Sequence, residues 1–389
     1  MLIGNMEKQY IQYTEDRAAE YRKQYVLPVI GVTGSVGKTT IKELTAEILS
    51  EKYTVLKSVG SCNGNISAVQ NVFAIKPQHQ VCVFEFGIDD FDQMERMVRC
   101  CRPTVPVLTG LSGIHLEKLK TLDHIYREKT HIFDTLSKGG KVIANGDSTE
   151  LMNRLYADDR VDSTDILTYG LSASCMMRAE NIVSNGMMGS RFQIVGEGLL
   201  ASPMDVEINL PGMHMVQNTL CAVLLGLLFG VPEQQIRRRL SAIPYIQQRC
   251  QVIQGHDVTV IDDSYNASPA SVFAALRLLE QCEGRRVCVL GDMNQLGAEE
   301  ESAHRSIGAL AAGIADELVF IGTLAQYMFL EAKQTEKEKK IYWYPDKNTF
   351  LTNRSRHIMP DDTVLVKASH QQGFSELVEL LKGDICREF

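Results

Sequence analysis

The segment VIGVTGSVGKTTIKELTAEIL, from Val29 to Leu49, is the most informative stretch of the chain. An apolar run, Val26 to Val32, ends in a glycine-rich turn, and an amphipathic helical pattern begins directly after it. In this strand–loop–helix order, backbone N–H groups, a helix N-terminus and one lysine can bind a polyphosphate. The segment therefore predicts a phosphate-binding loop.

The residues of this loop have distinct expected roles. Gly34 and Gly37 let the backbone turn tightly and approach phosphate oxygens, Lys38 reaches the β- and γ-phosphates, and the Thr39 hydroxyl binds Mg²⁺. Val32 stands where the stricter eight-residue signature has glycine, so the match is to the shorter Gly-x-x-Gly-Lys-Thr form. The expected nucleotide-binding residues of the loop are Gly34, Ser35, Val36, Gly37, Lys38, Thr39 and Thr40.

Length and composition are typical of a globular enzyme with two or three domains. The chain has 389 residues, of which 44% are hydrophobic and 23% charged. A net charge of -8, without any basic run, argues against a general nucleic-acid-binding surface. The polar segment Met1 to Lys23 is no signal peptide, and no apolar run reaches membrane-spanning length. The ten cysteines lack CxxC spacing, which predicts buried free thiols and a cytoplasmic location.

Short apolar runs alternate with helical patterns after the phosphate loop. This alternation predicts an α/β fold, with a phosphate-loop domain built on a mostly parallel sheet and helices on both faces. From Cys175 to Ile208 the pattern becomes β-rich, and we expect an inserted antiparallel layer there. A fresh alternation after Pro244 predicts a second, Rossmann-like α/β domain. The expected divisions are an N-terminal helical extension (1–28), a central ATP-binding domain (29–244) and a C-terminal ligase domain (245–389).

Three side chains of the central domain are candidate site residues. Glu85 lies at the carboxyl end of an apolar strand, where open α/β sheets bind ligands, and can ligate a metal or bind a helix N-terminus. His115 follows another strand end, where a histidine can ligate a metal or be an ordinary loop residue. Lys129 lies in a helical pattern, for which a solvated surface lysine is the simplest interpretation. The residues alone do not decide whether each of these three side chains belongs to a functional site.

Polar side chains also follow strands of the second domain. Asp262 and Asp263 come directly after one strand, and Asn266 leads into a helix. Paired acids at this position can bind ribose hydroxyls or a cation, or one of them can cap the helix. Asp292 and Lys367 repeat this placement at two further strand ends.

Taken in order, these segments resemble the Mur ligase family of ATP-dependent amide-forming ligases. IDDSYNASP and VLGDMNQLG resemble most closely the branch that adds D-alanyl-D-alanine to UDP-N-acetylmuramoyl-tripeptide. The segments that carry the resemblance are GVTGSVGKTT, FEFG, GIHLEKL, REKTHIF, PGMHMVQN, IDDSYNASP, VLGDMNQLG and VLVKAS.

The resemblance implies roles for individual residues. Thr39, Glu85 and His115 match magnesium ligands, and Lys129 matches a lysine that many members carry as a carbamate supporting a second Mg²⁺. In the second domain Arg249 matches a residue that contacts ATP phosphate. The implied catalytic residues are Lys38, Lys129, His115 and Arg249, and the implied nucleotide contacts beyond the loop are Asn218 near the adenine, Arg249, Asp263 and Asn266.

The chain departs from this family at its substrate-facing positions. Relatives carry an N-terminal domain that holds the UDP-sugar, whereas fewer than thirty residues precede the phosphate-loop strand here. Cys62-Asn63-Gly64-Asn65 replaces an asparagine–glutamate pair, Met215 replaces an asparagine, and His370-Gln371-Gln372 stands where relatives prefer arginine and glycine.

We therefore expect an ATP-dependent ligase that joins an amino acid or dipeptide amine to a carboxylate other than the usual UDP-muramoyl peptide. An authentic D-alanyl-D-alanine-adding ligase with a reduced N-terminus and a non-catalytic ATP-binding partner subunit are the alternatives. The N-terminal helix is expected to dock on its own chain or on a protein partner.

Overall fold

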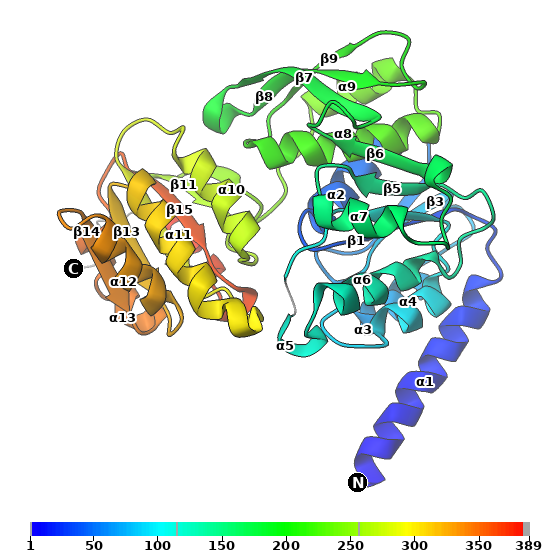
Figure 1. Cartoon of the computed structure of the whole chain (residues 1–389), viewed down its shortest axis with the longest axis horizontal. Coiled ribbons are helices and arrows are strands. Elements are labelled where there is room, and N and C mark those ends of the chain that lie inside the picture. Colours follow the sequence, from blue (N-terminus) through cyan, green and yellow to red (C-terminus); the bar gives the residue numbers. More distant parts are fainter. Residues whose placement is uncertain (1, 114–115, 256, 384–389) are drawn as a thin grey trace. The chain divides into compact units, whose positions relative to one another are not determined.

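The computed structural model describes residues 2–113, 116–255 and 257–383, and its chain divides into two compact units. Unit 1 comprises Met1–Ile182, Phe192–Val206 and Val216–Ile243, and unit 2 comprises Val183–Arg191, Glu207–Met215 and Pro244–Phe389. Each unit is an α/β structure in which helices pack on a sheet (Figure 1). This agrees with the expected fold class, while the domain boundaries at residues 28 and 244 stay predictions.

The first sheet, as far as the described residues show it, has nine strands in the order β2-β3-β1-β4-β5-β6-β7-β8-β9. Adjacent strands from β2 through β7 pair in parallel, so their carboxyl ends share one edge. The strands are β1 (Val29–Thr33), β2 (Val55–Lys57), β3 (Val81–Glu85), β4 (Val105–Leu108), β5 (Val142–Asn145), β6 (Ile166–Gly170), β7 (Met177–Ser184), β8 (Ser190–Gly196) and β9 (Met204–Ile208). The region 175–208 therefore extends this sheet, and the expectation that it forms an inserted layer was wrong.

Helices cover both faces of the parallel part of this sheet. The helices are α1 (Leu2–Arg22), α2 (Lys38–Leu49), α3 (Asn65–Phe73), α4 (Gln93–Cys101), α5 (Leu116–Leu119), α6 (Leu122–Thr130), α7 (Thr149–Tyr156), α8 (Met213–Leu228) and α9 (Glu233–Ser241). Residues of α1, α3, α4, α6 and α7 share one buried apolar cluster with alternate residues of the strands. The strand β1 is buried along its whole length because it pairs with β3 on one side and β4 on the other.

The second sheet has six strands within the described chain, in the order β10-β11-β15-β12-β13-β14. Among its described residues, β10 and β11 pair in an antiparallel manner and the other neighbouring strands pair in parallel. Its strands are β10 (Gln251–Gln254), β11 (Thr259–Asp262), β12 (Arg286–Gly291), β13 (Glu317–Ile321), β14 (Lys340–Tyr344) and β15 (Thr363–Lys367). Its helices are α10 (Pro269–Leu279), α11 (Glu300–Ile314), α12 (Ala325–Thr335), α13 (Lys347–Leu351) and α14 (Ser375–Lys382).

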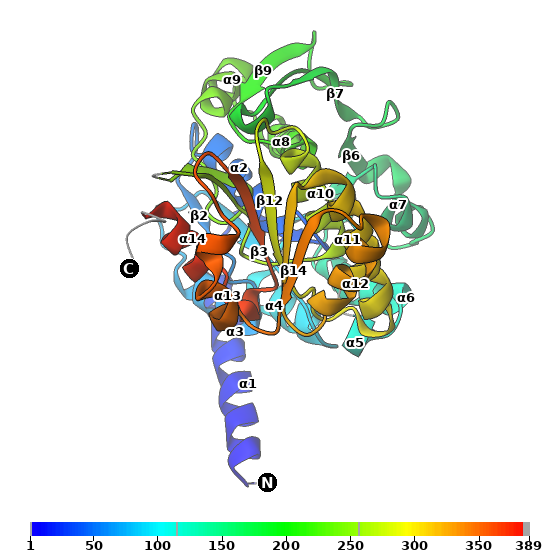
Figure 2. The same ribbon diagram turned by 90° about the vertical axis from the view of Figure 1, so that its left-hand side faces the viewer.

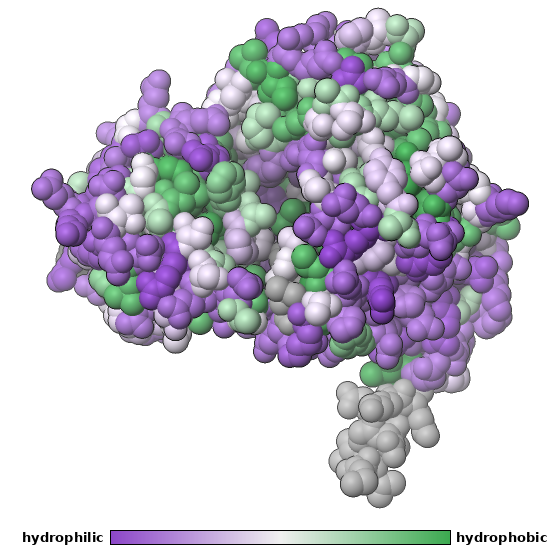
Figure 3. All heavy atoms as spheres, in the orientation of Figure 1, coloured by the Kyte–Doolittle hydropathy of each residue, from purple (hydrophilic) through white to green (hydrophobic). Residues whose placement is uncertain are grey.

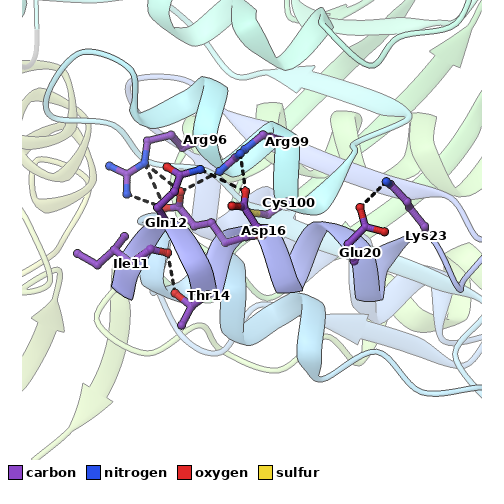
Figure 4. Close-up of polar contacts among 10 residues, drawn as sticks. Ile11, Gln12, Thr14, Asp16, Glu20, Lys23, Arg96, Arg99 and Cys100 are labelled. Carbon is purple, nitrogen blue, oxygen red and sulfur yellow. Dashed lines mark hydrogen bonds and ion pairs between the residues drawn. The ribbon is translucent and has the colours of Figure 1, made fainter. Parts of the chain in front are cut away.

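The helix α1 docks on unit 1 through its second half. Glu15 is buried beside α4, and its carboxylate forms ion pairs with Arg96 at 2.6 Å and Arg99 at 3.3 Å. Arg99 also pairs with the exposed Asp16 at 2.7 Å (Figure 4). At the end of the helix, the Arg22 guanidinium donates to the carbonyls of Cys101, Tyr25 and Leu27. The first half of α1 projects away from unit 1 in both ribbon views (Figures 1 and 2).

Burial corrects one expectation about the cysteines. The described cysteines are all free thiols, and all are buried except Cys62, which is exposed; Cys386 lies outside the described residues. Cys62 lies in the loop between β2 and α3. Among the helices that the structure describes, none is long and apolar enough to cross a membrane. The outer surface over α6 and α7 is mostly hydrophilic (Figure 3).

Candidate active site

The phosphate loop connects β1 to α2 at the carboxyl edge of the first sheet. Gly34 has φ 139° and Gly37 has φ 84°, conformations that L side chains rarely adopt. A Cβ atom at Gly34 would also collide with Thr109, which follows β4. At Gly37 it would lie 2.7 Å from the side-chain oxygen of Asn218. Both glycines are therefore required by the backbone path and by their close neighbours.

The loop after β4 holds the phosphate loop from one side. Ser35 N donates to the carbonyl of Gly110 at 3.1 Å, and Ser112 N donates to the Ser35 hydroxyl at 2.9 Å. The Thr109 hydroxyl donates to the carbonyl of Val36. These bonds hold the phosphate loop without using the N–H groups at the start of α2, where a phosphate would bind.

Two lysine amines converge on one carbonyl of the phosphate loop. Lys38 Nζ donates to the carbonyl of Gly34 at 2.9 Å, and Lys129 Nζ donates to the same oxygen at 3.3 Å. Lys129 is only 2% exposed, so it is not the solvated surface lysine that its helical pattern suggested. Burial, with the positive charge of Lys38 as a further cause, lowers the pKa of Lys129 well below its ordinary value. The shift favours the neutral amine, the form that can react as a nucleophile.

Glu85 offers an open carboxylate oxygen at the end of β3. The residue is 3% exposed, and its Oε1 accepts a hydrogen bond from Asn63 Nδ2 at 2.7 Å. Its Oε2 is buried and has no hydrogen-bond partner. A buried carboxylate oxygen without a donor is a suitable ligand for a hard cation such as Mg²⁺, and the hydroxyl of Thr39 is another.

These side chains suit a metal ion that is bound together with a nucleotide, rather than a metal site made wholly by protein. In the described part of the chain, no three His, Cys, Asp or Glu side chains cluster as metal ligands. Mg²⁺ usually keeps several waters and takes only one or two protein carboxylates beside substrate phosphates. Glu85 and Thr39 suit that mode. The expected ligand His115 lies outside the described residues, so its placement stays a prediction.

The loop that carries most of the departure Cys62-Asn63-Gly64-Asn65 joins these two candidate ligands, a role that the sequence did not suggest. The segment 58–64, between β2 and α3 and here called the β2–α3 loop, carries Ser61 and Asn63. The Ser61 hydroxyl lies 3.1 Å from that of Thr39, and Asn63 binds Glu85 as described. Ser and Asn in a short loop after a strand were a signal for side-chain hydrogen bonding, but their partners are distant in sequence.

Asn218, for which the resemblance implies a contact near the adenine, lies beside Gly37 at the start of α2. It is 8% exposed on α8. Its neighbour Gln217 donates to Asp147 Oδ2 at 2.7 Å, and Asp147 also accepts from the backbone N–H groups of Leu171 and Ser172. This part of α8 is therefore fixed against the loop that follows β6.

The candidates of unit 2 form their own cluster beyond β11 and β15. Lys367 Nζ donates to Asp263 Oδ2 at 2.5 Å and to the carbonyl of Asn266 at 2.8 Å. The remaining Asp263 oxygen, Oδ1, accepts from Cys250 N at 3.2 Å. Both carboxylate oxygens of Asp263 thus have partners within unit 2, so ribose binding would require Asp263 to share or exchange them.

Arg249 and Asn266 present polar groups at the edge of this cluster. The Arg249 guanidinium stacks over the ring of Tyr265 at 4.2 Å, and the Tyr265 ring lies 5.0 Å from that of His370. Asn266 is exposed, and its side-chain oxygen accepts from Ala267 N at 2.9 Å.

Comparison with known proteins gives consistent matches along the chain. The model of the Mur ligase middle domain matches residues 32–226, and that of the Mur ligase glutamate ligase domain matches residues 248–370. The chain is 29% identical over 367 residues to the UDP-N-acetylmuramoyl-tripeptide–D-alanyl-D-alanine ligase of Bacillus subtilis, covering 93% of this chain and 77% of that protein. The Escherichia coli ligase of the same description is 29% identical over 376 residues, covering 94% and 79%. A crystal structure of MurF from Acinetobacter baumannii superposes with a TM-score of 0.83 at 26% identity, covering 96% of this chain and 80% of that one.

Proposed function

Because the chain belongs to the Mur ligase family of ATP-dependent amide-forming ligases, we propose that it activates a substrate carboxylate with ATP and joins it to the amine of an amino acid or dipeptide. The observation that carries the proposal is the convergence of Lys38 and the buried Lys129 on the phosphate-loop carbonyl of Gly34. The ammonium of Lys38 places positive charge where a polyphosphate would bind, and the buried amine of Lys129 lies beside it.

The chemistry divides into two balanced steps. A carboxylate oxygen attacks the γ-phosphorus of ATP, the bond to the β,γ-bridging oxygen breaks, and ADP leaves. The amine then attacks the carbonyl carbon of the acyl phosphate, loses a proton, and expels inorganic phosphate. Neither step needs a nucleophilic side chain, so the protein acts by alignment and charge neutralisation.

Within this scheme Lys38 neutralises phosphate charge, and the loop N–H groups orient the nucleotide. Mg²⁺, when bound, would offset the charge of the phosphates; Thr39 and Glu85 would hold it, and His115 is proposed as a further ligand from the resemblance alone. The neutral amine of Lys129 is suited to react with carbon dioxide, giving a carbamate. That product would place a negative charge beside the ammonium of Lys38, in place of a neutral amine, and would offer oxygens to a second ion.

Nucleotide contacts from Asn218, Arg249, Asp263 and Asn266 are proposed on the resemblance, and a cytoplasmic location is proposed with them. The carboxylate substrate is proposed to differ from UDP-muramoyl-tripeptide. The support is the altered loop Cys62-Asn63-Gly64-Asn65, together with Met215 and His370, at positions that face substrate in relatives.

Hydroxylamine trapping tests this function without knowledge of the amine. The purified chain would be mixed with Mg²⁺, ATP and a panel of carboxylates that includes UDP-muramoyl-tripeptide, and hydroxamate and ADP would be measured. We expect both products with at least one carboxylate, and we expect Lys38→Ala to lose them. The control Lys52→Met should keep them, because the exposed amine of Lys52 binds the carbonyls of Phe229 and Gly230. Product formation with UDP-muramoyl-tripeptide would identify an authentic D-alanyl-D-alanine-adding ligase. Tight ATP binding without any hydroxamate across the panel would favour a non-catalytic partner subunit.

A further inference from the structure

A buried lysine that the proposed reaction does not use lies one turn along α2 from Thr39. Lys42 is 0% exposed. Its amine donates to the carbonyl of Ser58 at 2.9 Å and to the carbonyl of Gly60, and it forms an ion pair with Glu43 at 2.8 Å. An ammonium group has three donors, so these three acceptors satisfy it completely.

Burial of a lysine is costly unless its charge is paired and its donors are used. Both carbonyl acceptors belong to the β2–α3 loop, and Gly60 has φ 52°, a left-handed conformation. The charge of Glu43 is supported in turn by Lys57, at 2.6 Å. Burial would raise the pKa of Glu43, but its bonds to Lys42 and Lys57 outweigh burial and lower it. The arrangement is a charged clamp on this one loop.

The clamped loop contacts both candidate metal ligands. At its start, the Ser58 hydroxyl accepts from the backbone N of Glu85 and from Asn71 Nδ2, each at 3.0 Å. In its middle, Ser61 contacts Thr39, and near its end Asn63 donates to the Glu85 carboxylate. The carbonyl of Asn63 also accepts from Gly87 N at 2.8 Å. Lys42 therefore binds the loop at two points that lie among these contacts.

We propose that Lys42 is a positioning residue, which holds the β2–α3 loop so that Thr39 and Glu85 keep the geometry needed for a nucleotide-bound divalent cation. Lys42 does not touch the cation or the substrate. It acts through Ser58, Gly60 and Ser61, as the hydrogen-bonding neighbours of metal ligands do in other sites. The inference rests on the proposed Mg²⁺–nucleotide site.

Lys42→Met tests the clamp because methionine keeps an unbranched side chain and removes the charge and donors. Mn²⁺ would replace Mg²⁺, and its binding to protein saturated with a non-hydrolysable ATP analogue would be followed by electron paramagnetic resonance. Lys52→Met is the matched control, since it also removes a lysine that donates to two backbone carbonyls, but Lys52 lies three residues after the end of α2 at Leu49. We expect the Mn²⁺ dissociation constant to rise about tenfold or more in Lys42→Met and to stay within about twofold in Lys52→Met.

A second variant keeps the test decisive if Lys42→Met fails to fold by circular dichroism. Ser58→Ala leaves the buried charge intact and removes the hydroxyl that binds Glu85 N, and it is expected to weaken Mn²⁺ binding in the same direction. The inference is overturned if a folded Lys42→Met, or Ser58→Ala, binds Mn²⁺ as the control does. Absence of nucleotide-dependent Mn²⁺ binding by the unaltered protein would instead refute the proposed function itself.

Discussion

Lys129→Met is expected to change how the stability of the protein depends on pH. The amine of Lys129 is fully buried and lies beside Lys38, which together lower its pKa in the folded state. In the unfolded chain a lysine titrates near its ordinary value of about 10.4. Between the lowered folded pKa and that value, the unfolded state binds one more proton than the folded state. Stability of the unaltered protein therefore rises with pH across this window.

The size of the effect follows from the proton count. One proton difference contributes about 1.4 kcal/mol per pH unit to the free energy of unfolding. Methionine has no titrating group, so the stability advantage of Lys129→Met should shrink by that slope as pH rises within the window. The advantage itself should be largest at the low-pH end of the window, because the unaltered protein must keep a lysine uncharged there.

Urea denaturation from pH 7.5 to 9.5, in buffers free of carbon dioxide and nucleotide, measures this difference. Lys52→Met serves as the control, since its amine is exposed and its stability difference should not vary with pH. A difference between Lys129→Met and the unaltered protein that stays constant across the whole range would refute the assignment of a lowered pKa. It would also remove the physical basis for carbamate formation at this lysine.

Three further outcomes are expected. Lys38→Ala should stay folded, and its rate of hydroxamate formation should fall more than tenfold. Retention of over about a tenth of the activity would contradict the phosphate-loop role, because it corresponds to a rise of only ~1.4 kcal/mol in the activation barrier. Gly34→Ala should destabilise the fold by about 1–3 kcal/mol more than Gly139→Ala in urea denaturation. Both glycines have positive φ, but of the two only Gly34 would bring an added Cβ atom against a neighbour. Equal losses of stability would argue against the close contact with Thr109. Glu15→Gln should cost about 1–3 kcal/mol of stability by leaving Arg96 and Arg99 without their buried partner, whereas Asp16→Asn, at an exposed ion pair, should cost less than ~1 kcal/mol.

The sequence predicted those parts of the fold and site that depend on local pattern. The glycines and the lysine of the phosphate loop, the alternation of strands and helices, and the strand-end position of Glu85 can each be recognised within a few consecutive residues. The structure places Glu85 at the carboxyl edge of a parallel sheet, as expected, because β3 pairs directly with β1. The short strand β10 escaped notice because QVIQ offers only two apolar residues.

Features that depend on distant contacts could not be read from the sequence in this way. The pattern around Lys129 permits a surface lysine. Only the packing of α6 brings its amine to the carbonyl of Gly34, which lies 95 residues earlier in the sequence. In the sequence, Lys42 looks like an ordinary lysine of an amphipathic helix, because the carbonyls that it binds belong to the β2–α3 loop. The β-rich region 175–208 gave no sign that its strands would extend an existing sheet, since register between distant strands is set by tertiary packing.

The docking of α1 makes the amino-terminal end of the chain a natural point for rigid attachment. The helix has 21 residues and is therefore about 32 Å long. Its second half is fixed by Glu15 and Arg22, while its first half projects outward, so rotation of the helix would break buried contacts at its base. A carrier protein joined through an uninterrupted helical linker would be held at a defined angle to unit 1. Such a fusion would supply the added mass that electron cryomicroscopy of a 43.4 kDa chain requires.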